Sequence, residues 1–334
     1  MKRYLSWAAL GLVLSATPGL AQEVRVPPPD LFGTLTLTSE NDLFGGGSDR
    51  YYSNGALLTW RSPSAELPGP FAWLDRRLAW LFGDGTLRWG VSLGQNIYTP
   101  VDKFRYVPDP RDRPYAAHLY GTFSLTRSTG TTQTLLELQA GVVGPSALGE
   151  QVQNGYHRLI NVKRLNGWDS QLKDEPTLNA VVERRWRVPL ARLAGLETEL
   201  IPSVTAAAGN VAIHAGGGAV LRLGQGLEAD WGPTRIRPAM AGSSFFQPRQ
   251  EFGWYVFVGL DARLVGRDLF LDGNTFRSGG PSVNKHPLIG EAMAGAAVFW
   301  QGVRLAYTQV VRSEEFYGQR GTQTFGSISV SFRF

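Results

Sequence analysis

The segment between residues 40 and 55 carries oxygen-bearing side chains at a spacing that can hold a cation. Asn41 and Asp42 open a loop rich in Gly and Ser, and Ser53 follows on the returning segment. Carboxylate, amide and hydroxyl oxygens are the ligands that calcium prefers, whereas zinc favours His or Cys. The pattern predicts a hard-cation site at Asn41 and Asp42. An ordinary hairpin turn is the alternative, because Asn, Asp and Gly are common turn residues.

His157 is the second candidate for chemistry. The stretch 146–160 has helical spacing, and Glu150, Gln153 and His157 fall on one face of that helix. Imidazole titrates near neutrality and can take a proton from water or from a hydroxyl group, so His157 is the predicted general base. A solvated loop histidine is the alternative.

Basic side chains gather in the segment 99–112. Lys103 and Arg105 lie there, and such side chains can bind phosphates and acidic sugars. We therefore expect these two residues to bind an anionic substrate. Three aspartates in the same segment make a neutral, solvated loop an equal alternative.

The segments that must position these groups alternate apolar and polar residues. Trp89, Val91 and Leu93 share one side of an expected strand, and Arg88 and Ser92 share the other. Alternation with a period of two predicts strands that have one dry and one polar face. The dry face meets a second sheet in a soluble sandwich and meets lipid in a membrane barrel.

Strand length and aromatic strand ends favour the membrane barrel. Segments of ten or more residues match a tilted bilayer crossing, and Trp and Tyr near their ends are typical interfacial anchors. The final segment alternates Ile328, Val330, Phe332 and Phe334 with polar residues, as the terminal strand of bacterial outer-membrane proteins does. The sequence predicts an all-β fold: a transmembrane, up-and-down antiparallel barrel of about twelve strands with a short helix in an extracellular loop.

The expected strands lie near 32–39, 51–60, 86–98, 113–127, 132–143, 175–187, 197–209, 211–223, 251–265, 287–299, 302–313 and 323–334. With both termini in the periplasm, the loops that carry the candidate site residues face the extracellular side. The inner connections 61–85 and 224–250 are longer than such barrels normally have. Within the first of them, the segment from Trp73 to Trp80 is expected to form a short interfacial helix.

Composition and the start of the chain limit the class of protein. Lys2 and Arg3, an apolar run and small residues up to Ala21 predict a secretory signal over 1–21, which leaves 22–334 as one barrel domain. The formal charge of +5 falls to +3 without Lys2 and Arg3, which is too balanced to indicate a nucleic-acid partner. The chain has no cysteine, so neither disulfides nor thiolate metal sites are available.

Several of these stretches resemble one family, the outer-membrane lipid A 3′-O-deacylases. The matching pieces are Glu40-Asn-Asp-Leu-Phe44, Asp49-Arg-Tyr-Tyr-Ser-Asn-Gly55, Gly94-Gln-Asn-Ile-Tyr-Thr-Pro100, Gly144-Pro145, Gly149-Glu-Gln-Val-Gln-Asn154, His157-Arg-Leu-Ile160 and Trp168. The resemblance implies a twelve-stranded barrel with calcium-dependent esterase activity in the outer leaflet. Its substrate would be the 3′-acyl or acyloxyacyl group of lipid A, and its partners would be lipopolysaccharide and other outer-membrane lipids. We expect a monomer.

The resemblance also assigns roles to positions in this sequence. The family's cation-binding pair, hydroxyl, glutamine, base and basic residue would be Asn41, Asp42, Ser53, Gln153, His157 and Lys103. The family can carry an acidic residue six positions after the histidine, and this chain has Lys163 there. That departure changes the local charge, and with it the rate or the substrate.

Two mechanisms and two competing functions are open at this point. A cation at Asn41 and Asp42 would stabilise the oxyanion while His157 activates water, or Ser53 would act as the nucleophile with His157 as its base. We favour water, because a position shared by Ser and Thr suits a ligand or hydrogen-bonding role. Outer-membrane phospholipase A uses a His-x-Ser motif, and no histidine of this chain precedes Ser at that spacing. A non-enzymatic small porin or structural barrel is the other competitor.

Overall fold

The computed structural model describes residues 27–334 except 46–49, 160, 162 and 240–241. The strands are β1 (Thr34–Asn41), β2 (Tyr51–Arg61), β3 (Thr86–Thr99), β4 (Ala116–Ser128), β5 (Thr132–Val143), β6 (Glu175–Trp186), β7 (Val188–Pro189), β8 (Glu197–Gly209), β9 (Ala212–Gln225), β10 (Phe252–Asp268), β11 (Leu288–Trp300), β12 (Val303–Arg312) and β13 (Gln323–Arg333). All neighbouring strands are antiparallel, and the pairs β1–β13 and β6–β8 close the sheet into a barrel.

The two-residue strand β7 belongs to the sixth spanning strand. Arg185 of β6 pairs with Ser203, and Val188 of β7 pairs with Leu200 in the same register. The barrel therefore has twelve spanning strands, which confirms the predicted fold class. The predicted signal segment 1–21 lies outside the described residues, as do residues 46–49 of the first loop.

The two faces of each strand differ as the alternation predicted. On β3, Leu93 is 60% exposed on the outer surface of the barrel, whereas Arg88 is 2% exposed in the interior. Val91 lies on the outer face with Leu93, and Asn96 is buried with Arg88. The apolar outer surface is the one that would meet lipid, because successive side chains of a strand point to opposite faces of the sheet.

The interior of the barrel is filled by the long connection between β9 and β10. Arg235 donates to Glu40 of β1 at 2.8 Å, and Thr36 donates to the Ser244 carbonyl at 2.9 Å. Ile236 and Phe246 of the same connection are buried. The length of 224–250 is therefore explained by a segment that folds into the barrel and packs against strands from several sides.

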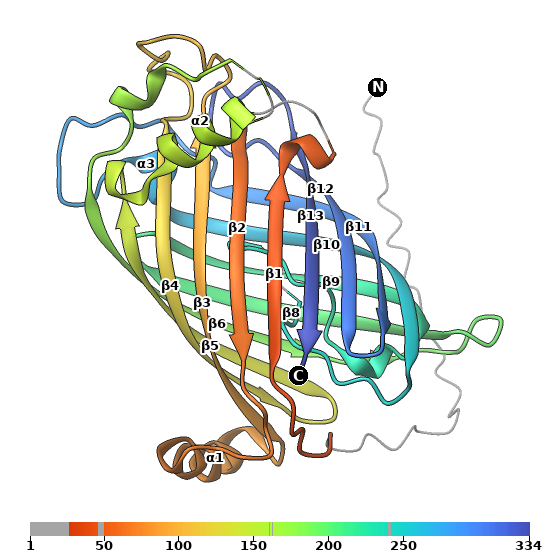
Figure 1. The fold of residues 1–334 in the computed structure, drawn as a ribbon. Helices are drawn as coiled ribbons and strands as arrows, with labels where there is room; N and C mark the ends of the chain where they lie inside the picture. Colours follow the sequence, from red (N-terminus) through yellow and green to blue (C-terminus); the bar gives the residue numbers. More distant parts are fainter. Residues whose placement is uncertain (1–26, 46–49, 160, 162, 240–241) are drawn as a thin grey trace, which may run out of the picture.

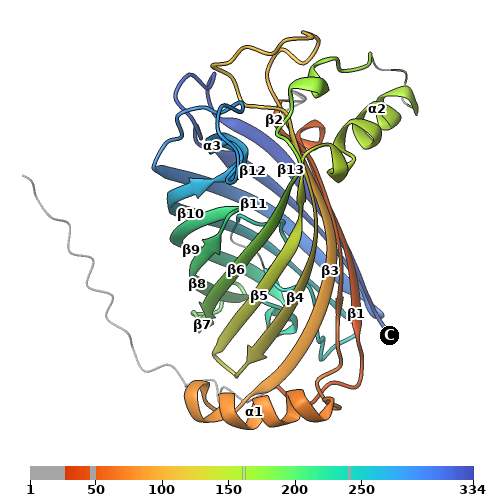
Figure 2. The ribbon, with the colours of Figure 1, turned by 90° about the vertical axis from the view of Figure 1, so that its left-hand side faces the viewer.

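Helices lie at both ends of the barrel (Figure 1). α1 (Gly69–Phe82) lies at the end that holds the C-terminus, and α2 (Gly149–Leu159) lies at the opposite end. In Figure 2, α2 lies outside the barrel wall rather than over the mouth of the barrel, and the strands that it contacts are β3 and β4. Among the described residues, no helix is long and apolar enough to cross a membrane. Both helices agree with the helical segments expected from sequence spacing.

Candidate functional site

The hairpin of β1 and β2 presents Asn41 and Asp42 at the end of the barrel that also holds α2. Asn41 accepts a hydrogen bond from the Leu43 amide at 2.8 Å through its side-chain oxygen and caps a short 3-10 helix, Asp42–Phe44. The buried Asp42 carboxylate accepts a hydrogen bond from the Arg50 amide at 2.6 Å. Both side chains therefore fix the shape of the loop that they begin.

Ser53 lies in a β-bulge on the returning strand. Tyr52 pairs with Tyr98 and Asn54 pairs with Ile97, so Ser53 is the extra residue of β2. Its buried hydroxyl forms a hydrogen bond of 2.6 Å with the hydroxyl of Thr99, the last residue of β3. A bulge redirects a side chain and ends regular pairing, and such bulges are common beside active sites.

The second half of the site is α2, which is seated directly on the barrel wall. A Cβ atom at Gly149 would collide with Ala117 of β4 and with the Trp168 ring. The side chain of Gln95 on β3 donates to the Ala147 carbonyl at 2.6 Å, just before the helix. Ile97, Ala117 and Trp168 belong to one buried apolar cluster under this helix. The absence of a side chain at Gly149 thus allows α2 to approach the outer surface closely.

His157 is held in one orientation by the backbone that follows α2. Its Nδ1 lies 3.0 Å from the Lys163 carbonyl oxygen, and His157 is 6% exposed. A carbonyl only accepts hydrogen bonds, so Nδ1 must be the donor, and the lone pair of the neutral ring is on Nε2. This is the tautomer in which Nε2 can act as a base. The orienting group is the backbone of Lys163, not its side chain.

Gln153 lies one helical turn before His157 and is 5% exposed. Its side-chain oxygen has no hydrogen-bond partner within the described part of the chain. A buried amide oxygen without a partner carries a desolvation cost that a bound ligand can remove. The neighbouring Asn154 is used structurally, because it accepts from the Leu165 amide at 2.9 Å and donates to the Leu165 carbonyl at 3.3 Å.

The segment after β3 is tied to the segment after α2. The Tyr115 hydroxyl donates to the Lys103 carbonyl at 2.8 Å, and the Asn166 amide donates to the same oxygen at 3.3 Å. The side chain of Asn166 also donates to the Phe104 carbonyl at 2.9 Å. Lys103 is therefore part of the same assembly as His157, whereas Arg105 is exposed further out in the loop.

Positive charge is concentrated around Phe104. The ammonium groups of Lys103 and Lys163 lie 5.9 Å and 4.9 Å from the centre of its ring, as expected for cation–π contacts. Among the nearby aspartates, Asp109 bonds to Arg111, and this hydrogen bond is the main reason that the pKa of Asp109 is lowered to about 2. Arg111 is thus neutralised within the loop, and the anion-binding role of Lys103 and Arg105 stays a prediction.

Strand β3 contacts both parts of the predicted site, the β1–β2 hairpin and α2. The hairpin is bonded to β3 through Ser53 and Thr99, and β3 leads directly into the loop that carries Lys103. The same β3 supports α2 through Gln95 and Ile97. The structure therefore links Ser53, Lys103, Gln153 and His157 through β3, places Asn41 and Asp42 on the neighbouring hairpin at the same end of the barrel, and leaves Arg105 further out in the loop.

The oxygen donors of the hairpin suit a hard cation. Among the described residues there is no group of three or more His, Cys, Asp or Glu arranged to hold a metal ion. Asn41 and Asp42 supply one amide and one carboxylate side chain, and calcium completes its shell with backbone oxygens and water. Each side-chain oxygen has two lone pairs, so the hydrogen bonds to Leu43 and Arg50 are compatible with a cation on the same atoms.

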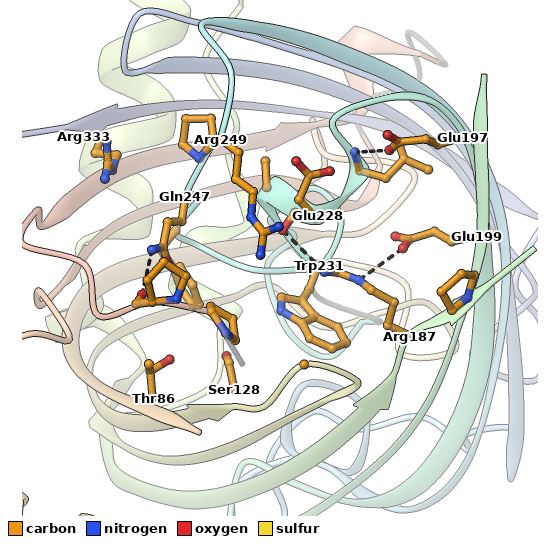
Figure 3. A pocket seen from close by; sticks show the side chains of 18 of the residues that line it. Thr86, Ser128, Arg187, Glu197, Glu199, Glu228, Trp231, Gln247, Arg249 and Arg333 are labelled. Atoms are coloured by element: carbon orange, nitrogen blue, oxygen red, sulfur yellow. Dashed lines mark hydrogen bonds and ion pairs between the residues drawn. The ribbon is translucent and has the colours of Figure 1, made fainter. Parts of the chain in front are cut away.

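A pocket of about 250 Å³ lies at the other end of the barrel and contains none of the predicted site residues (Figure 3). Arg187 forms an ion pair with Glu199 at 3.1 Å, and Glu197 accepts a hydrogen bond from the Leu227 amide at 3.0 Å. Arg187 also covers the Trp231 ring at 4.3 Å. These contacts fix the connection between β9 and β10, and we assign no chemistry to this pocket.

Sequence reasoning gave no role to Thr99 or Gln95, which the structure places at the centre of the site. A signal was present in the alternation. Both positions fall on the same face of β3 as Val91 and Leu93, which is otherwise apolar, yet both are polar. Polar residues on the dry face near one end of a strand indicate contact with something other than lipid. Here they contact Ser53 and the start of the α2 segment.

A closed twelve-stranded barrel with an apolar outer surface and a filled interior defines a β-barrel of the outer-membrane class. Residues 6–334 match the family described as outer membrane protein LpxR. The chain belongs to the LpxR family, which confirms the resemblance to outer-membrane lipid A deacylases inferred from the sequence.

Solved structures resemble this chain to different degrees. LpxR from Salmonella typhimurium is similar with a TM-score of 0.75 and 21% sequence identity, over 90% of this chain and 100% of that chain. The β domain of the Bordetella autotransporter BrkA is similar with a TM-score of 0.44 and 12% identity, over 91% of this chain and 99% of that chain. A search of curated protein sequences finds no match.

Proposed function

We propose that this protein hydrolyses the ester that links the 3′-acyl or acyloxyacyl group to lipid A. The observation that carries the proposal is the orientation of His157, whose Nδ1 donates to the Lys163 carbonyl at the end of the barrel that also holds Asn41, Asp42 and Ser53. Membership of the LpxR family supports the substrate class. The position of α2 outside the wall suits a substrate that lies in the membrane beside the barrel.

The proposal places this rim on the extracellular side of the outer membrane. The opposite end has the short turns after β4 and β11, and it holds the C-terminus. Bacterial barrels of this class have short periplasmic turns and longer extracellular loops. The long segments 99–115 and 144–174 would then face the leaflet that contains lipopolysaccharide.

The basic groups and Gln153 would bind the substrate. Lys103 and Arg105 would contact the phosphates and acidic sugars of lipid A and its core. The buried side-chain oxygen of Gln153 would accept a hydrogen bond from the substrate. The exposed Lys163, which stands where the family can have an acidic residue, adds a further positive charge to the same surface.

His157 would act as the general base toward water. Nε2 takes a proton from a water molecule whose oxygen bonds to the acyl carbon, and the same proton then passes to the sugar oxygen as the ester bond breaks. The products are a free fatty acid and the 3′-hydroxyl of the sugar. Ser53 would hold the hydrogen-bond network through Thr99 in this scheme rather than form an acyl-enzyme.

Asn41 and Asp42 would hold calcium. When bound, the ion polarises the ester carbonyl and stabilises the negative charge that develops on its oxygen. The chain contributes a hairpin whose shape is fixed by the Asn41 cap and by the bond between Asp42 and the Arg50 amide.

Mass spectrometry of lipid A tests the proposal. Purified protein is incubated in detergent with lipid A that keeps its 3′ group. We expect loss of that group with calcium present, and no loss when EGTA and excess magnesium replace calcium. His157→Gln and Asp42→Asn are each expected to reduce the rate at least about 100-fold, because each removes one catalytic function.

His286→Gln is the matched control. His286 lies in another loop, where it contacts the Tyr317 ring, and its replacement is expected to leave the rate unchanged. Heat-modifiable migration on gels shows that each variant keeps its barrel. Spectra that are identical for wild type, His157→Gln and Asp42→Asn would rule out the proposed activity.

A further inference from the structure

Helix α1 is fixed to the outer surface of the barrel. The Phe71 ring lies 5.6 Å from the Trp89 ring and 5.9 Å from the Phe123 ring, measured between centroids. Trp89 of β3 and Phe123 of β4 lie on the outer faces of their strands, in register with exposed apolar positions. The helix therefore packs on the lipid side of the wall and not across the mouth of the barrel.

Arg127 clamps this helix from the barrel. It is buried at the end of β4, bonds to the Asp75 carboxylate, and donates to the Gly83 carbonyl at 2.7 Å and 3.1 Å. One arginine thus holds both the middle and the C-terminal end of α1. Because both points of the helix are fixed to the barrel, the same side of α1 always points away from it.

That outward face consists of two tryptophans and two arginines. Trp73, Arg76, Arg77 and Trp80 follow helical spacing and lie on one side of α1. Trp73 is 54% exposed and Trp80 is 88% exposed, and Arg77 lies over the Trp73 ring at 5.6 Å. Large exposed aromatic side chains on one helix face indicate a binding surface.

The charge on this face is positive. Asp75 is used by Arg127, and within the described residues neither Arg76 nor Arg77 has a carboxylate partner. The exposed acidic residues that flank the helix in sequence are Glu66 and Asp84. Arginine binds phosphate oxygens with paired N–H donors, so the face suits an anionic phosphate ligand.

The position of α1 identifies which phosphate it meets. Trp60 and Trp89 contact each other at 4.8 Å on the outer surface, and exposed Leu58 and Val91 follow them toward the middle of the barrel. Aromatic residues of this kind mark the boundary between hydrocarbon and headgroups. α1 packs on Trp89 at this boundary, so its surface is continuous with the lipid-facing wall.

We propose that the face formed by Trp73, Arg76, Arg77 and Trp80 binds the headgroups of anionic phospholipids in the periplasmic leaflet. The choice of leaflet rests on the orientation given under the proposed function. The tryptophans lie among the glycerol and ester groups, and the two guanidinium groups contact phosphate. The barrel would thus contact different lipids at its two rims: lipid A at α2 and anionic phospholipid at α1.

Native mass spectrometry of the full-length protein tests this inference. The protein is released from micelles that contain equal amounts of phosphatidylglycerol and phosphatidylcholine. We expect wild type to retain phosphatidylglycerol preferentially. The variant R76Q/R77Q should lose this preference by about tenfold or more, since each basic group near an anionic surface contributes a several-fold increase in affinity.

Arg192→Gln is the matched control, because Arg192 is an exposed arginine in another connection at the same end of the barrel. It should retain both lipids as wild type does. R76Q/R77Q should deacylate lipid A at the wild-type rate. The lipid-binding experiment and the deacylation experiment therefore test the two proposals independently of each other. Equal retention of the two lipids by wild type, or an unchanged preference in R76Q/R77Q, would overturn the inference.

Discussion

At the scale of single residues, His157 is oriented by the backbone of Lys163 and not by its side chain. An acidic side chain at this position would suggest a carboxylate that aligns the imidazole. Here the backbone carbonyl of residue 163 accepts from Nδ1, while the lysine ammonium lies over Phe104. Any residue at position 163 supplies that carbonyl. The substitution therefore leaves the tautomer of His157 intact and alters the charge that the substrate meets.

The role of Ser53 can be decided by comparing two substitutions. Ser53→Thr keeps the hydroxyl that bonds to Thr99, and Ser53→Ala removes it. If water is the nucleophile, we expect near wild-type activity for Ser53→Thr and a loss of about tenfold to 100-fold for Ser53→Ala, as for one lost hydrogen bond that positions a catalytic group. Initial rates of lipid A deacylation measure both.

Intact-protein mass spectrometry during turnover completes this comparison. The water mechanism predicts no covalent adduct on any variant. A protein species heavier by one acyl group in wild type and absent in Ser53→Ala would show that Ser53 is the nucleophile.

At the scale of elements, the close approach of α2 to the wall depends on Gly149. A methyl group at this position would overlap Ala117 and Trp168, neither of which can move easily in the buried cluster beneath the helix. We expect Gly149→Ala to lift the start of α2, displace His157 and reduce deacylation about tenfold to 100-fold. A misplacement of about 1 Å in a catalytic group can have an effect of this size.

Gly155→Ala on the same helix is the control. A Cβ atom at Gly155 has open space around it, and alanine favours a helix by about 1 kcal/mol relative to glycine. This variant should keep full activity and equal or greater thermal stability. Equal activity of Gly149→Ala and Gly155→Ala would show that the seating of α2 is not needed for catalysis.

The elements that could be predicted from sequence are those determined by local patterns. Alternation predicted all twelve strands to within a few residues, and helical spacing predicted α1 and α2. Bonds between distant segments had no local signal. The pairing of Ser53 with Thr99 requires the bulge in β2, and the bond from His157 requires the path of the backbone to Lys163. The fold of 224–250 into the barrel was also missed, because only its unusual length was visible.

At the scale of the whole molecule, the filled interior argues against the porin alternative. The connection between β9 and β10 contributes Arg235, which is buried against Glu40 of β1 and Glu291 of β11. Arg304 of β12 bonds to Asp230 of the same connection at 2.7 Å. Charged groups that bond across the interior leave it packed rather than open as a water-filled channel.

Planar-bilayer recording tests this conclusion. We expect the purified protein to insert without stable single-channel conductance, because the connection is held to several strands by buried ion pairs. A general porin recorded in the same membrane is the control. Reproducible conductance steps of porin size from this protein would favour the non-enzymatic alternative.

Closure of the barrel also involves the segment before β1. Asp30 is buried and bonds through one oxygen to Arg88 of β3 at 2.7 Å and through the other to Arg333 of β13 at 2.6 Å. One carboxylate therefore joins strands on both sides of β1. Burial raises the pKa of Asp30, but the hydrogen bond from Arg333 and the charge of Arg88 outweigh this effect, so its pKa is lowered.

A lowered pKa in the folded state predicts the direction of the pH dependence. The contribution of Asp30 to stability is fully present above the pKa of the unfolded chain, about 4, and is lost as the pH falls through the folded-state pKa. Asp30→Asn should lower the unfolding midpoint in detergent at pH 6, by an amount that corresponds to about 3 kcal/mol for a broken buried ion pair. The difference from wild type should shrink toward pH 3, where wild type begins to lose the same charge. Asp84→Asn, which changes an exposed carboxylate in the connection before β3, should match wild type at both pH values. A pH-independent effect of Asp30→Asn would show that the residue acts by packing and not by charge.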